Sequence, residues 1–153
     1  SDVYKRQIPY VAMIHGIDTY KLLAEVNKQA GKAGRTVNCL LQIHVAQEET
    51  KFGFSPEECR EMLDAGEWKA LAHVRICGLM GMASNTDNIE QINGEFRLLS
   101  SLFKEIKENW FADSDVFREL SMGMSHDYHE AIASGSTLVR VGSKIFGERE
   151  YNI

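Results

Sequence analysis

The chain has 153 residues, of which 44% are hydrophobic, and its formal net charge is −5 at pH 7. This length allows one globular domain with a sizeable core, but it falls short of the roughly 200 residues that a closed eight-stranded β/α barrel usually needs. The acidic balance argues against a nucleic-acid-binding surface.

The first part of the chain predicts a strand and a helix. Ser1–Gln7 has neither a helical nor a strand period, and we expect it to be a non-native lead-in to a native sequence that begins at Ile8. The apolar run Val11–Ile14 predicts a short buried strand, with His15–Asp18 as the loop that follows. Thr19–Ala33 places its apolar residues on one helical face, and glycines mark its end.

The middle of the chain repeats this alternation. Val37–Val45 is β-branched and apolar, which is typical of a parallel strand covered on both faces. Ser55–Glu58 predicts a helix start, because it combines a capping serine, a proline at the first helical position and a glutamate for a capping box. We expect this helix to run to about Ala65 and to stop at Gly66. His73–Leu79 predicts the next strand.

The segment Asn88–Glu108 predicts the clearest amphipathic helix. Its apolar residues recur at steps of three and four: Ile89, Ile92, Phe96, Leu99, Phe103 and Ile106. A coiled coil is the alternative, but the stripe spans too few heptads, so packing against a sheet is favoured. A short strand from Glu119, a helix that opens near Ser125 and a buried strand Thr137–Val141 complete five strands and four helices. This β-α alternation favours a β/α barrel.

The ends of the last two strands predict an anion site. Gly142 and Ser143 follow the final strand and offer backbone N–H groups and a hydroxyl. Ser125, as the cap of the helix after the preceding strand, would add a hydroxyl and the positive end of the helix dipole. Adjacent βα loops lie at one edge of a parallel sheet, so these groups are expected to converge on a phosphate. Ordinary turn chemistry is the alternative reading.

Three motifs together resemble a known family. Met122–Ser125, Ala133–Thr137 and Val139–Ser143 with Ile145–Gly147 resemble the pyridoxal-phosphate homeostasis proteins, single-domain relatives of the alanine racemase barrel. The resemblance covers roughly Ile8 to the C-terminus. It implies an α/β fold, namely a (β/α)8 TIM barrel of the alanine racemase type that forms a single cofactor-binding domain. Residues 8–153 would be the C-terminal part of this barrel, with about five of its eight βα units.

The resemblance implies pyridoxal 5'-phosphate as the cofactor. In the racemase pattern a serine lies fifteen residues before the arginine of an Arg-x-Gly motif, and Ser125 and Arg140 match that spacing. It implies that Ser125, Gly142 and Ser143 bind the cofactor phosphate, and that Arg140 points inward and donates to the pyridine nitrogen. A permanently protonated arginine there makes the ring a poorer electron sink. A carboxylate or a backbone carbonyl is the alternative partner for a buried Arg140.

Three further residues are implied at lower specificity. Lys51 occupies the position where the racemases carry an arginine near the phenolic oxygen of the cofactor, and a solvated loop lysine is the alternative. Met80 and Met82 are implied as walls of the cofactor face, although core packing is the default role of methionine. Gly81 departs from the threonine common there, and we expect it to loosen that wall.

The resemblance implies a carrier and not an enzyme. Family members hold the cofactor covalently on a lysine at the end of the first barrel strand; we expect that strand and the next two upstream of Ile8, and no lysine here matches. The implied function is binding and intracellular homeostasis of the cofactor, without turnover, by a protein that is monomeric at full length. A racemase or decarboxylase of this fold is one alternative, but it needs a second domain, and only six residues follow Gly147. An unrelated phosphate-binding barrel is the other.

The remaining features concern compartment and metals. Cys39, Cys59 and Cys77 are an odd number without metal-like spacing, which favours a reduced cytoplasmic setting without disulfides. No apolar run approaches the ~20 residues of a membrane span, and no signal peptide is visible. The histidines show no convincing zinc pattern, so no metal is expected.

Overall fold

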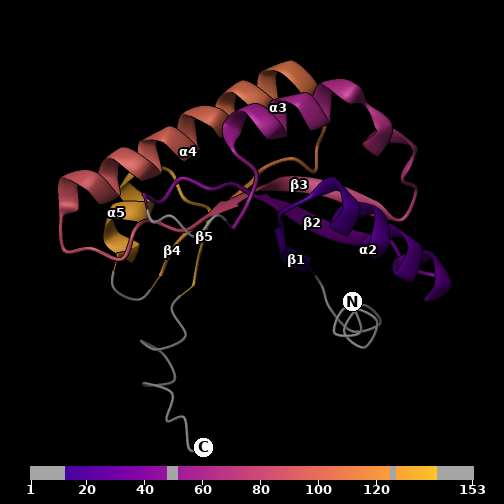
Figure 1. The fold of residues 1–153 in the computed structure, drawn as a ribbon, viewed down its shortest axis with the longest axis horizontal. Coiled ribbons are helices and arrows are strands. Elements are labelled where there is room, and N and C mark those ends of the chain that lie inside the picture. The colour runs from indigo at the N-terminus through magenta and orange to yellow at the C-terminus, as the bar shows by residue number, and fades with distance from the viewer. Residues whose placement is uncertain (1–12, 48–51, 125–126, 141–153) are drawn as a thin grey trace, which may run out of the picture.

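A curved parallel sheet organises the computed structural model, which describes residues 13–47, 52–124 and 127–140 (Figure 1). Its five strands lie in the order in which they occur along the chain, and every neighbouring pair is parallel. They are β1 (Met13–Ile17), β2 (Val37–Gln42), β3 (Val74–Gly81), β4 (Glu119–Met124) and β5 (Leu138–Arg140). Parallel neighbours need a crossover between them, and helices supply it.

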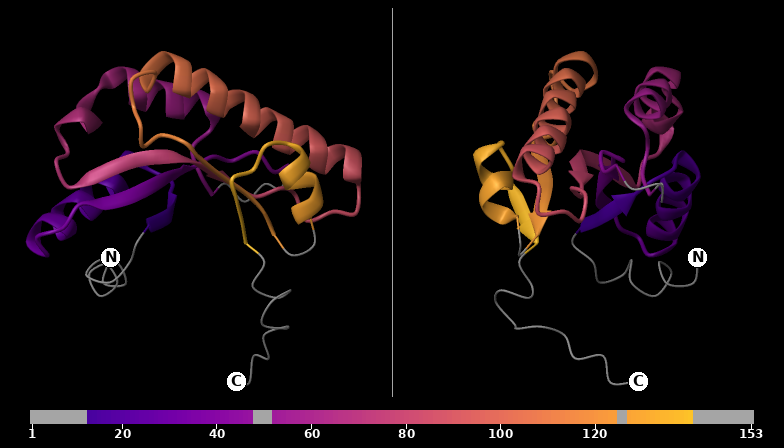
Figure 2. Two further views of the ribbon diagram at one scale, coloured as in Figure 1. Left: turned by 180° about the vertical axis from the view of Figure 1, so that it is seen from behind. Right: turned by 60° about the vertical axis from the view of Figure 1, so that its left-hand side comes forward.

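The helices lie on one face of this sheet, as Figures 1 and 2 show from several sides. They are α2 (Tyr20–Lys32), α3 (Pro56–Ala65), the 3-10 helix η1 (Glu67–Ala70), α4 (Ile89–Trp110) and α5 (Tyr128–Ala133). The main core fills the layer between helices and sheet, where Leu23 of α2, Leu41 of β2 and Phe96 of α4 are fully buried. A curved parallel sheet with helices outside is the wall of an incomplete β/α barrel.

Local sequence signals set the helix starts. Ser55 accepts from the backbone N–H of Glu58 at 3.1 Å, and the Glu58 carboxylate accepts from the backbone N–H of Ser55 at 3.0 Å. Gly66 ends α3 in the left-handed conformation, with φ of 76°. Thr19 caps α2 by accepting from the backbone N–H of Leu22 at 3.0 Å. The predicted capping box and stop of α3 are therefore confirmed.

Strand ends differ from the prediction where pairing across the sheet decides them. The loop expected at His15–Asp18 is wrong for residues 15–17, because β1 runs on to Ile17, which is fully buried and paired with Leu41. Conversely, β2 ends at Gln42 and not at Val45, since Ile43 forms an isolated bridge with Phe54. β3 runs two residues past the expected end, to Gly81.

The other face of the sheet is apolar as well. Leu40, Cys77 and Met80 form a second buried cluster, against which Met13 and Leu138 pack. All five lie on strands β1, β2, β3 and β5, and none on a described helix. We call this set the inner cluster, because it lies on the face that a barrel turns toward its axis.

A bulge in β3 brings the inner cluster together. Gly78 has φ of 156°, and a Cβ atom there would lie 1.7 Å from the Glu119 carbonyl oxygen, so only glycine fits this approach of β3 to β4. The pairing of β3 with β2 skips Cys77 at this point, since Cys39 pairs with Ile76 and Leu40 with Gly78.

Candidate functional site

The candidate site lies where the parallel strands end. In a β/α barrel the loops that follow the carboxyl ends of the strands gather at one rim, and functional groups are found there. In this sheet β2 ends at Gln42, β3 at Gly81 and β5 at Arg140. The ends of β2 and β3 are joined by the Ile43 N–H, which donates to the Met80 carbonyl at 2.8 Å.

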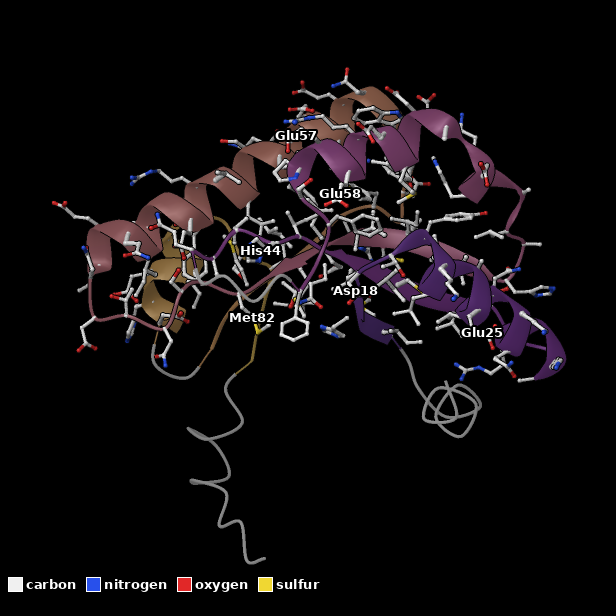
Figure 3. All side chains as sticks on the ribbon, viewed as in Figure 1. Asp18, Glu25, His44, Glu57, Glu58 and Met82 are labelled. Carbon is white, nitrogen blue, oxygen red and sulfur yellow. The ribbon has the colours of Figure 1, made fainter. Side chains whose placement is uncertain are left out.

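A hollow of about 300 Å³ opens between the loops that follow β2 and β3. We call it the rim pocket; its lining residues are Ile43, His44, Val45, Ala46, Phe52, Met82, Ala83 and Asn85. Phe52 and Met82 stand at its opening, with 60% and 39% of their surface exposed. In Figure 3 the Met82 side chain projects on the side of the sheet away from α4. The pocket is thus mainly apolar, and its exposed groups suit the face of a flat ring.

A buried carboxylate fixes the two loops of the rim pocket. Glu95 of α4 is only 5% exposed and accepts from the backbone N–H of Ser84 at 2.6 Å and from the Ser84 hydroxyl at 2.7 Å. Gln91 donates to it as well, at 3.2 Å. The Ser84 oxygen in turn accepts from the backbone N–H of Gln47 at 2.8 Å. We call these contacts the Glu95 network.

Sequence reasoning missed this network, although one signal for it exists. Glu95 lies three residues after Ile92 and four before Leu99, inside the apolar stripe of α4. A charged residue on a buried helix face needs partners, so its position predicts a polar partner on the adjoining loop. The identity of that partner, Ser84, follows only from the fold.

Met80 and Met82 have different surroundings: the first is buried among the strands, and the second is partly exposed at the rim. Met80 belongs to the inner cluster and is 7% exposed, whereas Met82 lies on the opening of the rim pocket. Between them, a Cβ atom on Gly81 would lie 2.7 Å from Leu99 Cδ2 of α4. The expectation that Gly81 loosens the cofactor wall is therefore wrong: this position faces the helix layer, and it lacks a side chain because Leu99 fills the space.

A serine–threonine pair places the start of β5. After α5, the Gly135 N–H donates to the Ile132 carbonyl at 3.1 Å, with φ of 99°, and the chain turns back to β4. The Thr137 hydroxyl oxygen accepts from the Leu120 N–H at 2.7 Å, and the Ser136 hydroxyl donates to the Leu138 carbonyl at 2.6 Å. These bonds anchor the amino end of β5, and hence the position at which it reaches the rim.

The predicted phosphate site falls largely outside the described residues. Ser125, Gly142, Ser143 and Lys51 all lie outside them. The backbone of Arg140 is described, and it closes β5 in register with Met124. The helix expected to open near Ser125 begins at Tyr128, with Asp127 as its N-cap residue. The convergence of these residues on one phosphate remains a prediction.

The titratable side chains of the described part offer no activated thiol. Burial raises the pKa of Cys39 and of Cys59 to about 12, and it raises the pKa of Cys77 as well. All three thiols are free and buried. Because the thiolate is the reactive form, these cysteines are poor nucleophiles and poor metal ligands at neutral pH.

Two negative findings apply to the described residues alone. Among them, no group of three or more histidine, cysteine, aspartate or glutamate side chains could hold a metal ion. Nor does the described part include a helix with the length and apolar character that crossing a membrane requires.

Family membership follows from comparison with known proteins. The family model of the alanine racemase N-terminal domain matches residues 5–150, and the chain belongs to that family. Within it, the chain is similar to pyridoxal phosphate homeostasis proteins: it is 36% identical to that of Aquifex aeolicus over 141 residues, which cover 92% of this chain and 60% of the relative. The human protein of the same name is 35% identical over 148 residues, covering 95% of this chain and 53% of the relative. The chain thus spans between half and two thirds of the length of these relatives.

Solved structures agree on the fold. PipY of Synechococcus elongatus, determined without PLP, matches with a TM-score of 0.86 and 28% identity over 96% of this chain and 66% of its own. PipY with PLP bound matches with a TM-score of 0.81 and 27% identity over 95% of this chain. An alanine racemase of Clostridium difficile matches at 14% identity with a TM-score of 0.67, which shows the shared fold alone. The chain therefore has the fold of part of the alanine racemase barrel.

Proposed function

We propose that the rim at the carboxyl ends of these strands forms part of a pyridoxal 5'-phosphate site, in a protein that carries and buffers this cofactor without turning over a substrate. One observation carries the proposal: a relative with PLP bound superposes on 95% of this chain with a TM-score of 0.81 and 27% identity. The similar proteins of Aquifex aeolicus and Haemophilus influenzae are both named pyridoxal phosphate homeostasis protein, which supports the same role.

The residues of this chain fit such a cofactor in two respects. The inner cluster and the rim pocket supply apolar surface for a ring, with Met80 and Met82 at the level where β3 reaches the rim. The Ser136 and Thr137 hydroxyl oxygens accept from the backbone N–H groups of Met122 and Leu120 in β4, and these bonds fix the strand that ends in Arg140. A ring between apolar walls, with polar groups at its ends, is the usual arrangement of a small-molecule site.

Each residue has a proposed task. Ser125, Gly142 and Ser143 hold the phosphate through a hydroxyl and backbone N–H groups, which together supply several charge-assisted hydrogen bonds. Arg140 donates to the pyridine nitrogen and keeps it unprotonated, because an arginine side chain does not give up its proton. When bound, the cofactor supplies an aldehyde and an electron-withdrawing ring. Lys51 is proposed near its phenolic oxygen.

The same residues favour a carrier over an enzyme. An arginine at the pyridine nitrogen weakens the ring as an electron sink, so the cofactor is held in a form of restricted reactivity. The buried thiols of Cys39 and Cys59 stay protonated and do not add to the aldehyde, since burial raises the pKa of each to about 12. We also propose a reducing, cytoplasmic setting, which free buried thiols suit.

Titration of the natural protein that contains this chain tests the proposal. Pyridoxal 5'-phosphate should bind with a change in its absorption spectrum, and pyridoxal, which lacks the phosphate, should bind at least tenfold more weakly. Assays for racemisation and decarboxylation of amino acids should show no turnover. Equal affinity for both ligands would exclude the phosphate site, and sustained turnover would favour the racemase-like alternative.

A further inference from the structure

The Glu95 network joins two loops that the sheet alone leaves apart. One follows β2 and includes Gln47, and the other follows β3 and includes Ser84, which lies 37 positions after Gln47 in the chain. Both loops contribute to the rim pocket, through Val45 and Ala46 on one side and Ala83 on the other. The carboxylate that holds them belongs to α4, in the outer layer, and thus does not itself line the pocket.

The contacts run in one direction along the network. A backbone N–H only donates, so the Ser84 oxygen accepts from Gln47, and the Ser84 hydroxyl hydrogen is left to donate to Glu95. The Ser84 N–H also donates to the same carboxylate. In this arrangement Glu95 acts as an acceptor at both oxygens, one toward the Ser84 N–H and the other toward the Ser84 hydroxyl. A glutamine of the same shape has one oxygen and one NH2 group, and it accepts from Ser84 at only one of the two places.

Because these groups are buried, the loss of one of their hydrogen bonds is costly. Ser84 is 3% exposed and Glu95 is 5% exposed, so water does not readily replace a lost partner. Removing one partner from a buried, charged hydrogen-bond network leaves the others unsatisfied, and it costs more than the lost bond itself. The loops are then expected to separate in preference to keeping unpaired groups in place.

We infer that Glu95 is a positioning residue for the cofactor: through Ser84 it sets the spacing of the two loops that form the rim pocket, and this inference rests on the function proposed above. The cofactor binds a pocket whose width is fixed before it arrives. Pre-organisation of this kind raises affinity, because the two loops are already ordered and binding does not lose free energy in ordering them.

The chain offers a matched control on the same helix. Glu105 also lies on α4 and also holds a strong partner, Arg60 of α3, with the Arg60 Nε 2.6 Å from Glu105 Oε2. That pair lies between two helices and contributes nothing to the rim pocket. Glu95→Gln and Glu105→Gln therefore remove the same charge from the same helix, and only the first releases the two loops.

The experiment compares these variants in the natural protein that contains this chain. Glu95→Gln should weaken pyridoxal 5'-phosphate binding about tenfold, whereas Glu105→Gln should change it less than about twofold. Before cofactor is added, hydrogen exchange should accelerate in peptides that contain Gln47 and Ser84, and should stay unchanged in the core strands. If Glu95→Gln does not fold, Ser84→Ala keeps the backbone bond to Glu95 and should weaken binding by a smaller factor, about threefold.

Four results would overturn the inference. Unchanged affinity in Glu95→Gln, with or without faster exchange of the two loops, would reduce the network to a structural role. Faster exchange throughout the protein would show a general loss of stability. Equal losses of affinity in Glu95→Gln and Glu105→Gln would show an effect of charge alone. If the parent protein binds no cofactor, the proposed function itself is wrong. This outcome is distinguishable, because neither the parent nor any variant then binds pyridoxal 5'-phosphate.

Discussion

At the scale of single residues, Gly81 shows how the helix layer constrains the rim. The residue ends β3 between Met80 and Met82, but its missing Cβ atom points at Leu99 of α4, at 2.7 Å. Leu99 is fully buried in the main core, so it has little room to move. Gly94 offers the opposite case on α4 itself, because a Cβ atom there meets nothing within 4 Å.

These two glycines predict opposite effects of one substitution. Gly81→Ala should lower the free energy of unfolding by about 1–2 kcal/mol through overpacking, whereas Gly94→Ala should raise it by about 0.5–1 kcal/mol, because alanine favours the helix. Urea unfolding of each variant measures both. In a Leu99→Ala background the cost of Gly81→Ala should shrink, and an undiminished cost there would exclude Leu99 as the cause.

The buried cysteines predict a dependence of stability on pH. In the unfolded chain a thiol titrates near pH 8.5, whereas burial raises the pKa of Cys39 and Cys59 to about 12. Folding therefore favours the protonated thiol. Its stabilising contribution is complete below about pH 8.5 and is lost as the pH rises toward 12, at up to about 1.4 kcal/mol per pH unit for each thiol.

Cys59→Ala tests that sign. The variant loses buried contacts at every pH, but its stability should fall less steeply than that of the parent between pH 8.5 and 10.5. Chemical unfolding at several pH values gives both slopes. If the stability of the parent and that of Cys59→Ala fall equally steeply with pH, the Cys59 thiol ionises as readily in the folded protein as in the unfolded chain.

At the scale of elements, helix starts depend on local bonds and strand ends on distant ones. The capping box of Ser55 and Glu58 is complete within four residues, so the sequence predicts it correctly. The early end of β2 depends on Phe54, whose N–H donates to the Gln42 carbonyl at 2.8 Å. No period in the sequence of β2 indicates that partner, and the prediction of a longer strand was therefore wrong.

The cap of α3 gives a prediction at this scale. Ser55→Ala should lower the free energy of unfolding by about 1 kcal/mol, because the Glu58 N–H loses its acceptor. Ser55→Asp keeps a side-chain oxygen at the cap and adds a negative charge at the positive end of the helix dipole. It should therefore lower the free energy of unfolding by only a few tenths of a kcal/mol. Thermal unfolding of the pair is the measurement, and equal losses would argue against the cap.

The candidate site was predictable only in part, because it too depends on packing between elements that the sequence does not show. Motifs between Met122 and Gly147 pointed to the cofactor family, and the comparisons agree. The roles of Gly81 and Glu95 depend on α4 packing against the end of β3, which brings Glu95 to Ser84, eleven residues earlier in the chain. Sequence shows that Glu95 is charged within an apolar stripe, but only the fold shows what it binds.

At the scale of the whole molecule, the sheet has two edges. In the described part, β1 and β5 each pair with one neighbour, and the inner cluster lies between them on the face without helices. A closed barrel has no such edges, because its first and last strands pair with each other. Exposed edges and an apolar face favour association between chains.

The 153-residue chain, expressed alone, should therefore self-associate. Sedimentation velocity over a range of concentrations should show a weight-average mass that rises with concentration, or loss of soluble protein. A single species of monomer mass that unfolds cooperatively would show instead that the two edges are satisfied within the chain.

The most direct test of the proposed cofactor site is a titration of site variants with pyridoxal 5'-phosphate, in the natural protein that contains this chain. Gly142→Val should weaken binding most, because a side chain obstructs close approach of the backbone to the phosphate. Ser125→Ala should weaken it less, by the loss of one charge-assisted hydrogen bond of roughly 1.5–3 kcal/mol. Arg140→Gln should leave the phosphate held and change the absorption spectrum of the bound cofactor. If Gly142→Val binds as tightly as the parent, the cofactor phosphate does not lie after β5 and the proposed site is wrong.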